Sequence, residues 1–366
     1  MTISSQRLPG LDGLRALAVS CVLFSHAFAS AGFPTLGWLS QLQRTFSGLF
    51  GVQVFFTISG FIITLLLCRE KQGTGSVSLK QFWLRRALRI LPPAVAYLLV
   101  VQVVMIAGAA PVPGETQWGS LLFYRNFMPQ EPWFTADQGL TAHYWTLSVE
   151  EQFYLFWPIL VAALSPGALR RVALTGIGLS VVLRACGVFL PPGHERWLPM
   201  NLDGFMLGAL VALGVPGLTF WRWRWPLLVA ALVLTRLQAS GLQVFVAPIQ
   251  PLAVALAAAV WIAGLVRNPE GIESRLLNSR PLVALGVISY SVYLWQQICL
   301  APASHWSSGV APWFTQFPQN LILCLLCGTL SYLLVERPCQ RLKTWLSNRR
   351  THSQLTALSH ASPGLH

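Results

Sequence analysis

The first apolar segment of the chain carries two ionisable residues, Arg15 and His26, eleven positions apart. At roughly 100° per residue, eleven positions make about three helical turns, so both side chains would project from one helix face, about 16 Å apart. Ionisable groups inside a membrane are costly unless they are paired or hydrated, which makes both residues candidates for function. Arg15 could instead extend its side chain to the interface, but His26 lies too deep in the segment to do so.

Later apolar segments contain carboxylates that could act with this imidazole. Glu150 and Glu151 are adjacent, so their side chains diverge by about 100° and cannot both face one site. The polar residues expected in the same half of the membrane as His26 are Glu150 or Glu151, Asp203 and Gln296. A carboxylate beside an imidazole orients it and stabilises its protonated form, as a general base requires to take a proton from a hydroxyl. The alternative is a salt-bridge network that only orders the helices.

Arg86 and Arg89 form a second candidate group, at the start of an apolar segment. Their i, i+3 spacing would direct both guanidiniums to one side of a helix. Such a pair at a membrane surface suits phosphate groups, either of lipids or of a nucleotide-bearing ligand. Membrane topology alone would also supply cations at this position, so both interpretations stay open at this point.

The composition predicts the helices that must position these groups. The chain has 366 residues, of which 54% are hydrophobic and 10% are charged, whereas soluble domains carry about 25% charged residues. We therefore expect an all-α, polytopic membrane bundle of about ten transmembrane helices, although several segments are shorter than the roughly 20 residues of an upright span. The predicted spans are 11–31, 47–68, 91–109, 144–165, 172–190, 200–215, 225–237, 242–266, 282–302 and 317–336.

Most of the 25 Lys and Arg residues fall on one side of these predicted spans. The positive-inside rule then places both termini in the cytoplasm. Topology thereby explains the net charge of +13, and no nucleic-acid partner is expected. The expected environment is a bacterial cytoplasmic (inner) membrane, with contacts to its lipids.

Residues 1–345 are expected to form one transmembrane domain, and the Ser-, His- and Thr-rich residues 346–366 a disordered cytoplasmic tail. The seven Cys mostly fall within the predicted spans or at their ends, and no metal site is predicted. No internal repeat is evident, which argues against a transporter.

Six short motifs occur in order along the chain. They are LDGLRA at 11–16, GVQVFFTISGF at 51–61, RRALRILP at 85–92, WTLSVEEQFY at 145–154, SYSVYLW at 289–295 and VERP at 335–338. Together they resemble the acyltransferase-3 family of integral membrane O-acyltransferases, over about 8 to 340. The resemblance implies transfer of an acyl group, commonly acetyl from acetyl-CoA, to a hydroxyl of a carbohydrate such as a surface polysaccharide or a lipid-linked sugar.

The resemblance extends to single residues. Arg15 and His26 match the Arg-x10-His element of the family. Arg86 and Arg89 match its Arg-x-x-Arg element, and Glu150 matches its acidic position better than the residue that follows. Many relatives have His after the Tyr-Leu-Trp sequence, where this chain has Gln, and glutamine cannot act as a base.

The residues and the resemblance together predict three groups of site residues. They are His26, Glu150 and Asp203 for catalysis, Arg15, Arg86 and Arg89 for the phosphates of acyl-CoA, and Ser59, Tyr290 and Gln296 for positioning the substrate. Acyl-CoA, in the simplest case acetyl-CoA, is expected as a co-substrate, with no permanently bound cofactor. His26 would activate the acceptor hydroxyl for attack on the thioester, or carry the acyl group itself. Alternatives are acylation of a small molecule such as a macrolide or an amino sugar, and non-enzymatic transport of a sugar or lipid.

Overall fold

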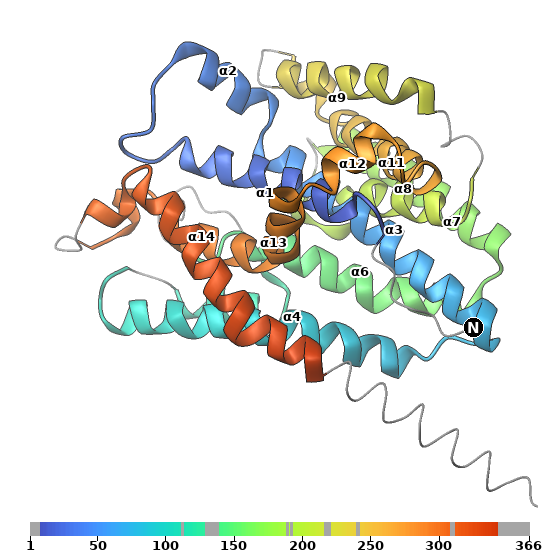
Figure 1. Cartoon of the computed structure of the whole chain (residues 1–366), viewed down its shortest axis with the longest axis horizontal. Coiled ribbons are helices and arrows are strands. Elements are labelled where there is room, and N and C mark those ends of the chain that lie inside the picture. Colours follow the sequence, from blue (N-terminus) through green and yellow to red (C-terminus); the bar gives the residue numbers. More distant parts are fainter. Residues whose placement is uncertain are drawn as a thin grey trace, which may run out of the picture.

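The computed structural model describes residues 8–110, 113–128, 139–187, 190, 193–215, 221–238, 242–307 and 312–342. The predicted tail at 346–366 lies outside these residues. Within them the chain forms helices and no β-strand, and an isolated bridge joins Ala31 to Gln316. The all-α prediction is therefore confirmed for the described residues (Figure 1).

The helices include nearly all of the apolar segments recognised in the sequence. The α-helices are α1 (Leu11–Ala27), α2 (Gly37–Thr45), α3 (Gly48–Thr74), α4 (Leu79–Ile106), α5 (Gly114–Leu121), α6 (Tyr144–Ala163), α7 (Pro166–Ala185), α8 (Leu202–Ala212), α9 (Arg224–Gln238), α10 (Gln243–Val246), α11 (Gln250–Arg267), α12 (Ile272–Leu277), α13 (Arg280–Cys299) and α14 (Gln319–Ser331). The short 3-10 helices used below are η1 (Arg125–Phe127), η4 (His194–Arg196) and η5 (Leu198–Asn201), and a π-helical turn at Tyr332–Glu336 follows α14.

Six helical stretches of the described chain are long and apolar enough to cross a membrane. They are Gly37–Thr74, Leu79–Ile106, Pro166–Ala185, Gln250–Arg267, Arg280–Cys299 and Gln319–Leu342. The 17-residue α1 and the 11-residue α8 are shorter than the roughly 20 residues of an upright span. The chain is thus an integral membrane protein with several spanning helices, whereas the count of ten and the cytoplasmic termini stay predictions.

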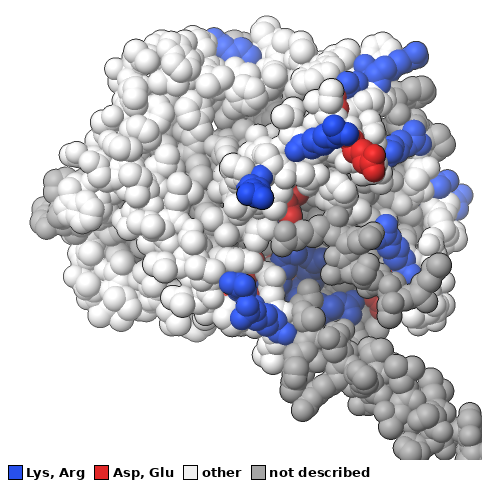
Figure 2. Space-filling view, in the orientation of Figure 1, with Lys and Arg blue, Asp and Glu red and all other residues white. Residues whose placement is uncertain are grey.

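Charged side chains are unevenly distributed over the surface. In Figure 2 the visible Lys and Arg side chains gather toward the centre and right of the view, and its left side is largely uncharged. An excess of cations at one end of a helical bundle is the pattern on which the positive-inside rule rests.

The central helix α3 packs against α1, α6, α8 and α11. Its approach to α8 is close, because a Cβ atom on Gly60 would lie 2.0 Å from the carbonyl oxygen of Phe205. A Cβ atom on Gly208 would likewise lie 2.0 Å from the carbonyl oxygen of Thr57. Small residues permit such contact between membrane helices, and this contact fixes the position of Ser59 beside the first glycine.

Lys71, near the end of α3, holds the end of α6. Its Nζ donates to the carbonyl oxygens of Val161, Ala162 and Leu164, each at 2.9 Å. All three ammonium donors are therefore used, and the cation lies at the negative end of the α6 dipole. This contact fixes the relative position of the two helices that supply the candidate serine and carboxylate.

We expect the substitution Lys71→Met to lower the unfolding temperature of the purified protein, because the end of α6 loses a charged donor. A hydrogen bond to a charged group contributes about 1.5–3 kcal/mol, so a loss of that order is expected. Lys80→Met, at an exposed position, is the control and should change stability by less than about 0.5 kcal/mol. Thermal unfolding followed by tryptophan fluorescence measures both variants. Equal unfolding temperatures for Lys71→Met and wild type would contradict this role.

Candidate functional site

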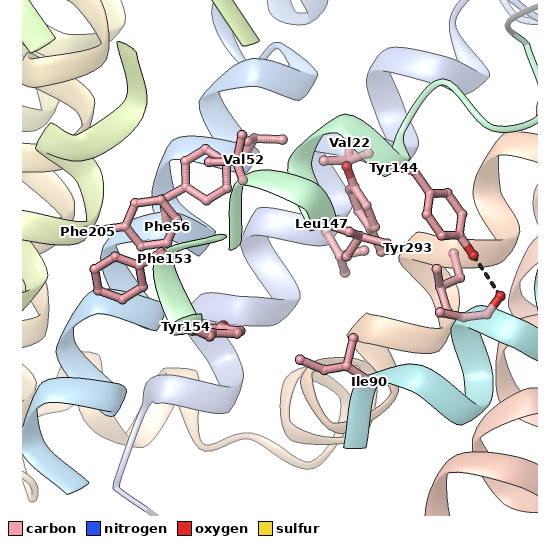
Figure 3. Packing of buried hydrophobic residues seen from close by; sticks show 14 of the residues in the cluster. Val22, Val52, Phe56, Ile90, Tyr144, Leu147, Phe153, Tyr154, Phe205 and Tyr293 are labelled. Atoms are coloured by element: carbon pink, nitrogen blue, oxygen red, sulfur yellow. Dashed lines mark hydrogen bonds between the residues drawn. The ribbon is translucent and has the colours of Figure 1, made fainter. Parts of the chain in front are cut away.

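A cavity of about 90 Å³ lies among α1, α3, α4, α6 and α13. The predicted site residues in its lining are Arg15, Ser59, Arg86, Arg89, Glu150 and Tyr290. Apolar walls complete it, and Figure 3 shows Val52, Phe56, Ile90, Leu147 and Tyr293 of this lining together with the side chains packed around them. The structure thus brings together both predicted arginine elements and the preferred glutamate, which come from three different helices.

Glu150 is held in the cavity by a hydroxyl chain. Ser59 Oγ donates to Glu150 Oε1 at 2.5 Å, and Tyr154 OH donates to Ser59 Oγ at 3.1 Å. Ser59 had no evident base near it in the sequence, because its partner lies 91 residues further along the chain. These bonds orient the carboxylate and occupy one of its two oxygens, and the tyrosine adds an aromatic ring to the cavity wall.

The cavity arginines, Arg15, Arg86 and Arg89, are only partly buried. Within the described residues, none of the three makes an ion pair with a carboxylate. The Arg86 guanidinium lies over the ring of Tyr154, 5.4 Å from its centroid. Arg85 points elsewhere and pairs with Glu70 at 3.1 Å. Three guanidiniums without an ion-pair partner around one cavity can bind phosphate groups.

Glu336 is a buried carboxylate close to the cavity arginines, outside the cavity lining, to which the sequence reasoning gave no role. It lies in the π-helical turn Tyr332–Glu336, is 1% exposed, and accepts hydrogen bonds from Ser291 at 2.7 Å and Gln340 at 2.9 Å. Its charge acts on Arg89 and Arg15. Single π-turns inside α-helices are frequent at functional sites. The VERP motif contained the signal, but no role had been assigned to its glutamate.

His26 lies near the end of α1, and its side chain is not among those that line the cavity. Its Nδ1 is 2.9 Å from the carbonyl oxygen of Val22. A carbonyl can only accept, so this bond places the proton on Nδ1 and leaves the lone pair of Nε2 available as a base. The pairing with a carboxylate expected from the sequence is not found among the described residues. The backbone performs the orienting role instead.

Asp203 pairs with an arginine in the structure and not with the imidazole. Asp203 Oδ2 accepts from Arg184 Nη2 at 2.7 Å, and the aspartate is 0% exposed. Arg184 also donates to the backbone carbonyls of Pro248 and Met200. Asp203 does not line the cavity. The structure therefore places it in a buried ion pair that joins α7, η5, α8 and the segment before α11.

The two remaining predicted residues lie on α13 but in different surroundings. Tyr290 lines the cavity, and its hydroxyl donates to the carbonyl oxygen of Ile90 at 2.9 Å. Gln296 is 0% exposed and donates to Gln297 at 3.2 Å, outside the cavity lining. The structure therefore leaves Tyr290 available for contact with a bound group and places Gln296 elsewhere.

The chain matches the family model described as an acyltransferase domain over residues 8–336. It belongs to the acyltransferase-3 family. Similar curated proteins include the O-acetyltransferase OatA of Staphylococcus aureus strains NCTC 8325, COL and MRSA252, each 27% identical over 375 residues. These alignments cover 92% of this chain and 58% of each relative, so this member of the family spans less than two thirds of their length. No solved structure matches it.

Proposed function

We propose that this membrane acyltransferase moves an acyl group from acyl-CoA to a hydroxyl of a carbohydrate, such as a surface polysaccharide or a lipid-linked sugar. The observation that carries the proposal is the set of cavity arginines without an ion-pair partner, beside a carboxylate fixed by a hydroxyl chain. The family match supports the reaction class, and the name O-acetyltransferase given to the similar proteins supports acetyl as the group.

The donor would bind with its phosphates on the cavity arginines. Guanidiniums form paired hydrogen bonds with phosphate oxygens, and their affinity for phosphate grows where water is excluded. The pantetheine arm of acyl-CoA is long enough to carry the thioester from these groups into the bundle. A cavity of about 90 Å³ favours a short acyl group, which agrees with acetyl.

His26 would act on the acceptor hydroxyl. The hydroxyl oxygen attacks the thioester carbonyl, the proton passes to Nε2, and the thiolate of CoA leaves and takes up a proton. The Val22 carbonyl keeps the imidazole in the tautomer that this step requires. In the alternative route, Nε2 attacks the thioester first and the acyl-histidine then transfers the group to the acceptor.

Donor binding is tested by the substitutions Arg86→Gln and Arg89→Gln. We expect each to raise the KM for acetyl-CoA roughly tenfold to a hundredfold, because a charge-assisted bond to phosphate is lost. Arg85→Gln is the matched control, since it removes the same charge from the same helix but outside the cavity. Release of free CoA by protein in lipid nanodiscs measures all three. An unchanged KM in both cavity variants would contradict the assignment, and sugar movement without thioester consumption would favour a transporter.

A further inference from the structure

Arg125 is the most unusual charged residue outside the cavity. It lies in η1, its side chain is 0% exposed, and Nε, Nη1 and Nη2 have no hydrogen-bond partner. Burial, followed by the nearby charge of Arg196, lowers the pKa of Arg125 to about 10. The guanidinium therefore stays protonated at neutral pH. A buried cation without a counterion is strongly unfavourable. Binding of an anion would compensate the charge of Arg125.

A second guanidinium lies close by. The helix η1 packs against η4, which carries Arg196. Nη1 of Arg196 is buried without a hydrogen-bond partner, and its guanidinium lies 5.8 Å from the ring centroid of Trp145. The carboxylate beside it, that of Glu195, is 57% exposed and lies 3.9 Å from His194. Among the described residues, neither Arg125 nor Arg196 makes an ion pair.

Arg125 and Arg196, called here the distal arginine pair, lie near a different part of α6 from the cavity arginines. Arg196 covers Trp145, whereas Arg86 covers Tyr154, and these two rings are nine residues or roughly 14 Å apart along the helix. Trp145 packs edge-on against Phe56 of the cavity wall, with ring centroids 6.5 Å apart. The cavity thus has one group of cations on each side.

His143 connects the distal arginine pair with the rest of the site. It is 4% exposed, and its ring packs edge-on against those of Tyr97 and Tyr144. It lies within electrostatic reach of both Arg125 and His26. Its ring packs on that of Tyr293, 5.7 Å away, and the Tyr293 hydroxyl bonds Thr146 of the cavity wall at 2.6 Å. A ligand held by the distal pair would therefore lie on the same side of the cavity as the candidate base.

We propose that the distal arginine pair binds an oxyanion, either a carboxylate or a phosphate, carried by the acceptor. Five N–H donors in a planar fork match two oxygens of either group, and the exposed part of Arg196 gives access from outside. The pair positions the acceptor so that a hydroxyl faces His26. This assignment rests on the proposed function, in that it names the chemical class of the acceptor.

Binding to the purified protein tests the site without an activity assay. The probes are sodium glucuronate and inorganic phosphate, with glucose as the neutral control, all at constant ionic strength. We expect at least one oxyanion, and not glucose, to raise the unfolding temperature of wild type in a saturable way. The cavity arginines can also bind phosphate. The quantity of interest is therefore the difference in probe binding between wild type and Arg125→Gln. A response to glucuronate alone identifies a carboxylate, and a response to phosphate alone a phosphate.

The substitution Arg125→Gln should weaken this binding roughly tenfold or more, since a charge-assisted pair is lost. Arg196→Gln, at a partly exposed position, should weaken it as well, and Arg44→Gln, at an exposed position, should leave it unchanged. Arg125→Gln should also unfold at the same or a higher temperature than wild type, because it removes an unpaired buried charge. If Arg125 only stabilised the fold, Arg125→Gln would unfold at a lower temperature than wild type.

The outcomes separate this assignment from the proposed function. The site assignment is overturned if neither oxyanion binds to wild type, or if Arg125→Gln and Arg196→Gln both bind as wild type does. Arg125-dependent binding without transfer to any acceptor would retain the site and reject the acyltransferase proposal. In a third outcome, wild type and Arg125→Gln transfer the acyl group equally well, and each equally to charged and neutral acceptors. That result would support the acyltransferase proposal and reject the oxyanion site.

Discussion

Replacement of His26 by asparagine is expected to abolish most acyl transfer while the protein still folds. Asparagine keeps an N–H donor that can bond the Val22 carbonyl, but it offers no basic nitrogen. General-base catalysis by a positioned histidine contributes roughly 10²- to 10⁴-fold, so kcat should fall by that factor. The KM for acetyl-CoA should change little, because the phosphates would bind to Arg86 and Arg89 in the cavity, and His26 does not line that cavity.

Two measurements make this prediction specific. Free CoA release gives kcat, and the unfolding temperature shows whether the variant is intact. The variant His26→Ala leaves a space, so added imidazole should restore part of its activity, as a merely structural role would not allow. Wild-type kcat in His26→Asn would remove His26 from the mechanism and return it to helix packing.

Helical periodicity predicts which side chains share one face of the same helix. This aspect of the site could be predicted from the sequence. Arg15 and His26 do lie on one continuous helix, α1. The cavity then brings Arg15 together with Arg86, Arg89 and Glu150, all carried by the motifs that indicated the family. The spacing of residues within each helix follows from local rules, because it fixes the direction and the height of a side chain, whereas the meeting of three helices at one cavity was indicated only by the family resemblance.

The prediction that His26 and a carboxylate lie at equal depth depended on where the helices end. The first span was predicted to reach residue 31, but α1 ends at Ala27. His26 is therefore one residue from the helix end instead of five. Glu150 lies six residues inside α6, which starts at Tyr144. The predicted end of the first span therefore differs from the end of α1 by four residues, because the ends of membrane helices depend on turns that hydropathy does not resolve.

Lateral partners could not be predicted, because they depend on how helices rotate and pack. The bond between Ser59 and Glu150 follows from the contact of α3 with α6. One partner was within reach of sequence reasoning. Asp203 and Arg184 carry opposite charges on consecutive apolar segments near the same end, and buried charges in membranes are usually paired.

The substitution Asp203→Ala should destabilise the protein more than any other change considered for stability. It would leave Arg184, whose side chain is 9% exposed, without its carboxylate. Breaking a buried ion pair on one side costs about 3–5 kcal/mol, because the remaining charge is uncompensated. We expect a large fall in unfolding temperature and in yield. Asp203→Asn should lose less stability than Asp203→Ala, since the amide oxygen of asparagine still accepts a hydrogen bond from the guanidinium of Arg184.

The double substitution Asp203→Ala with Arg184→Met decides between an ion pair and a catalytic role. If Asp203 acts only through its partner, removing both charges should recover part of the lost stability, because no buried cation is left unpaired. The kcat of the double variant, per folded molecule, should then be close to that of wild type, since Asp203 lies outside the cavity lining. A well-folded Asp203→Asn that releases no CoA would instead restore Asp203 to the reaction. In that case the carboxylate would have to reach the acceptor in a conformation in which it releases Arg184.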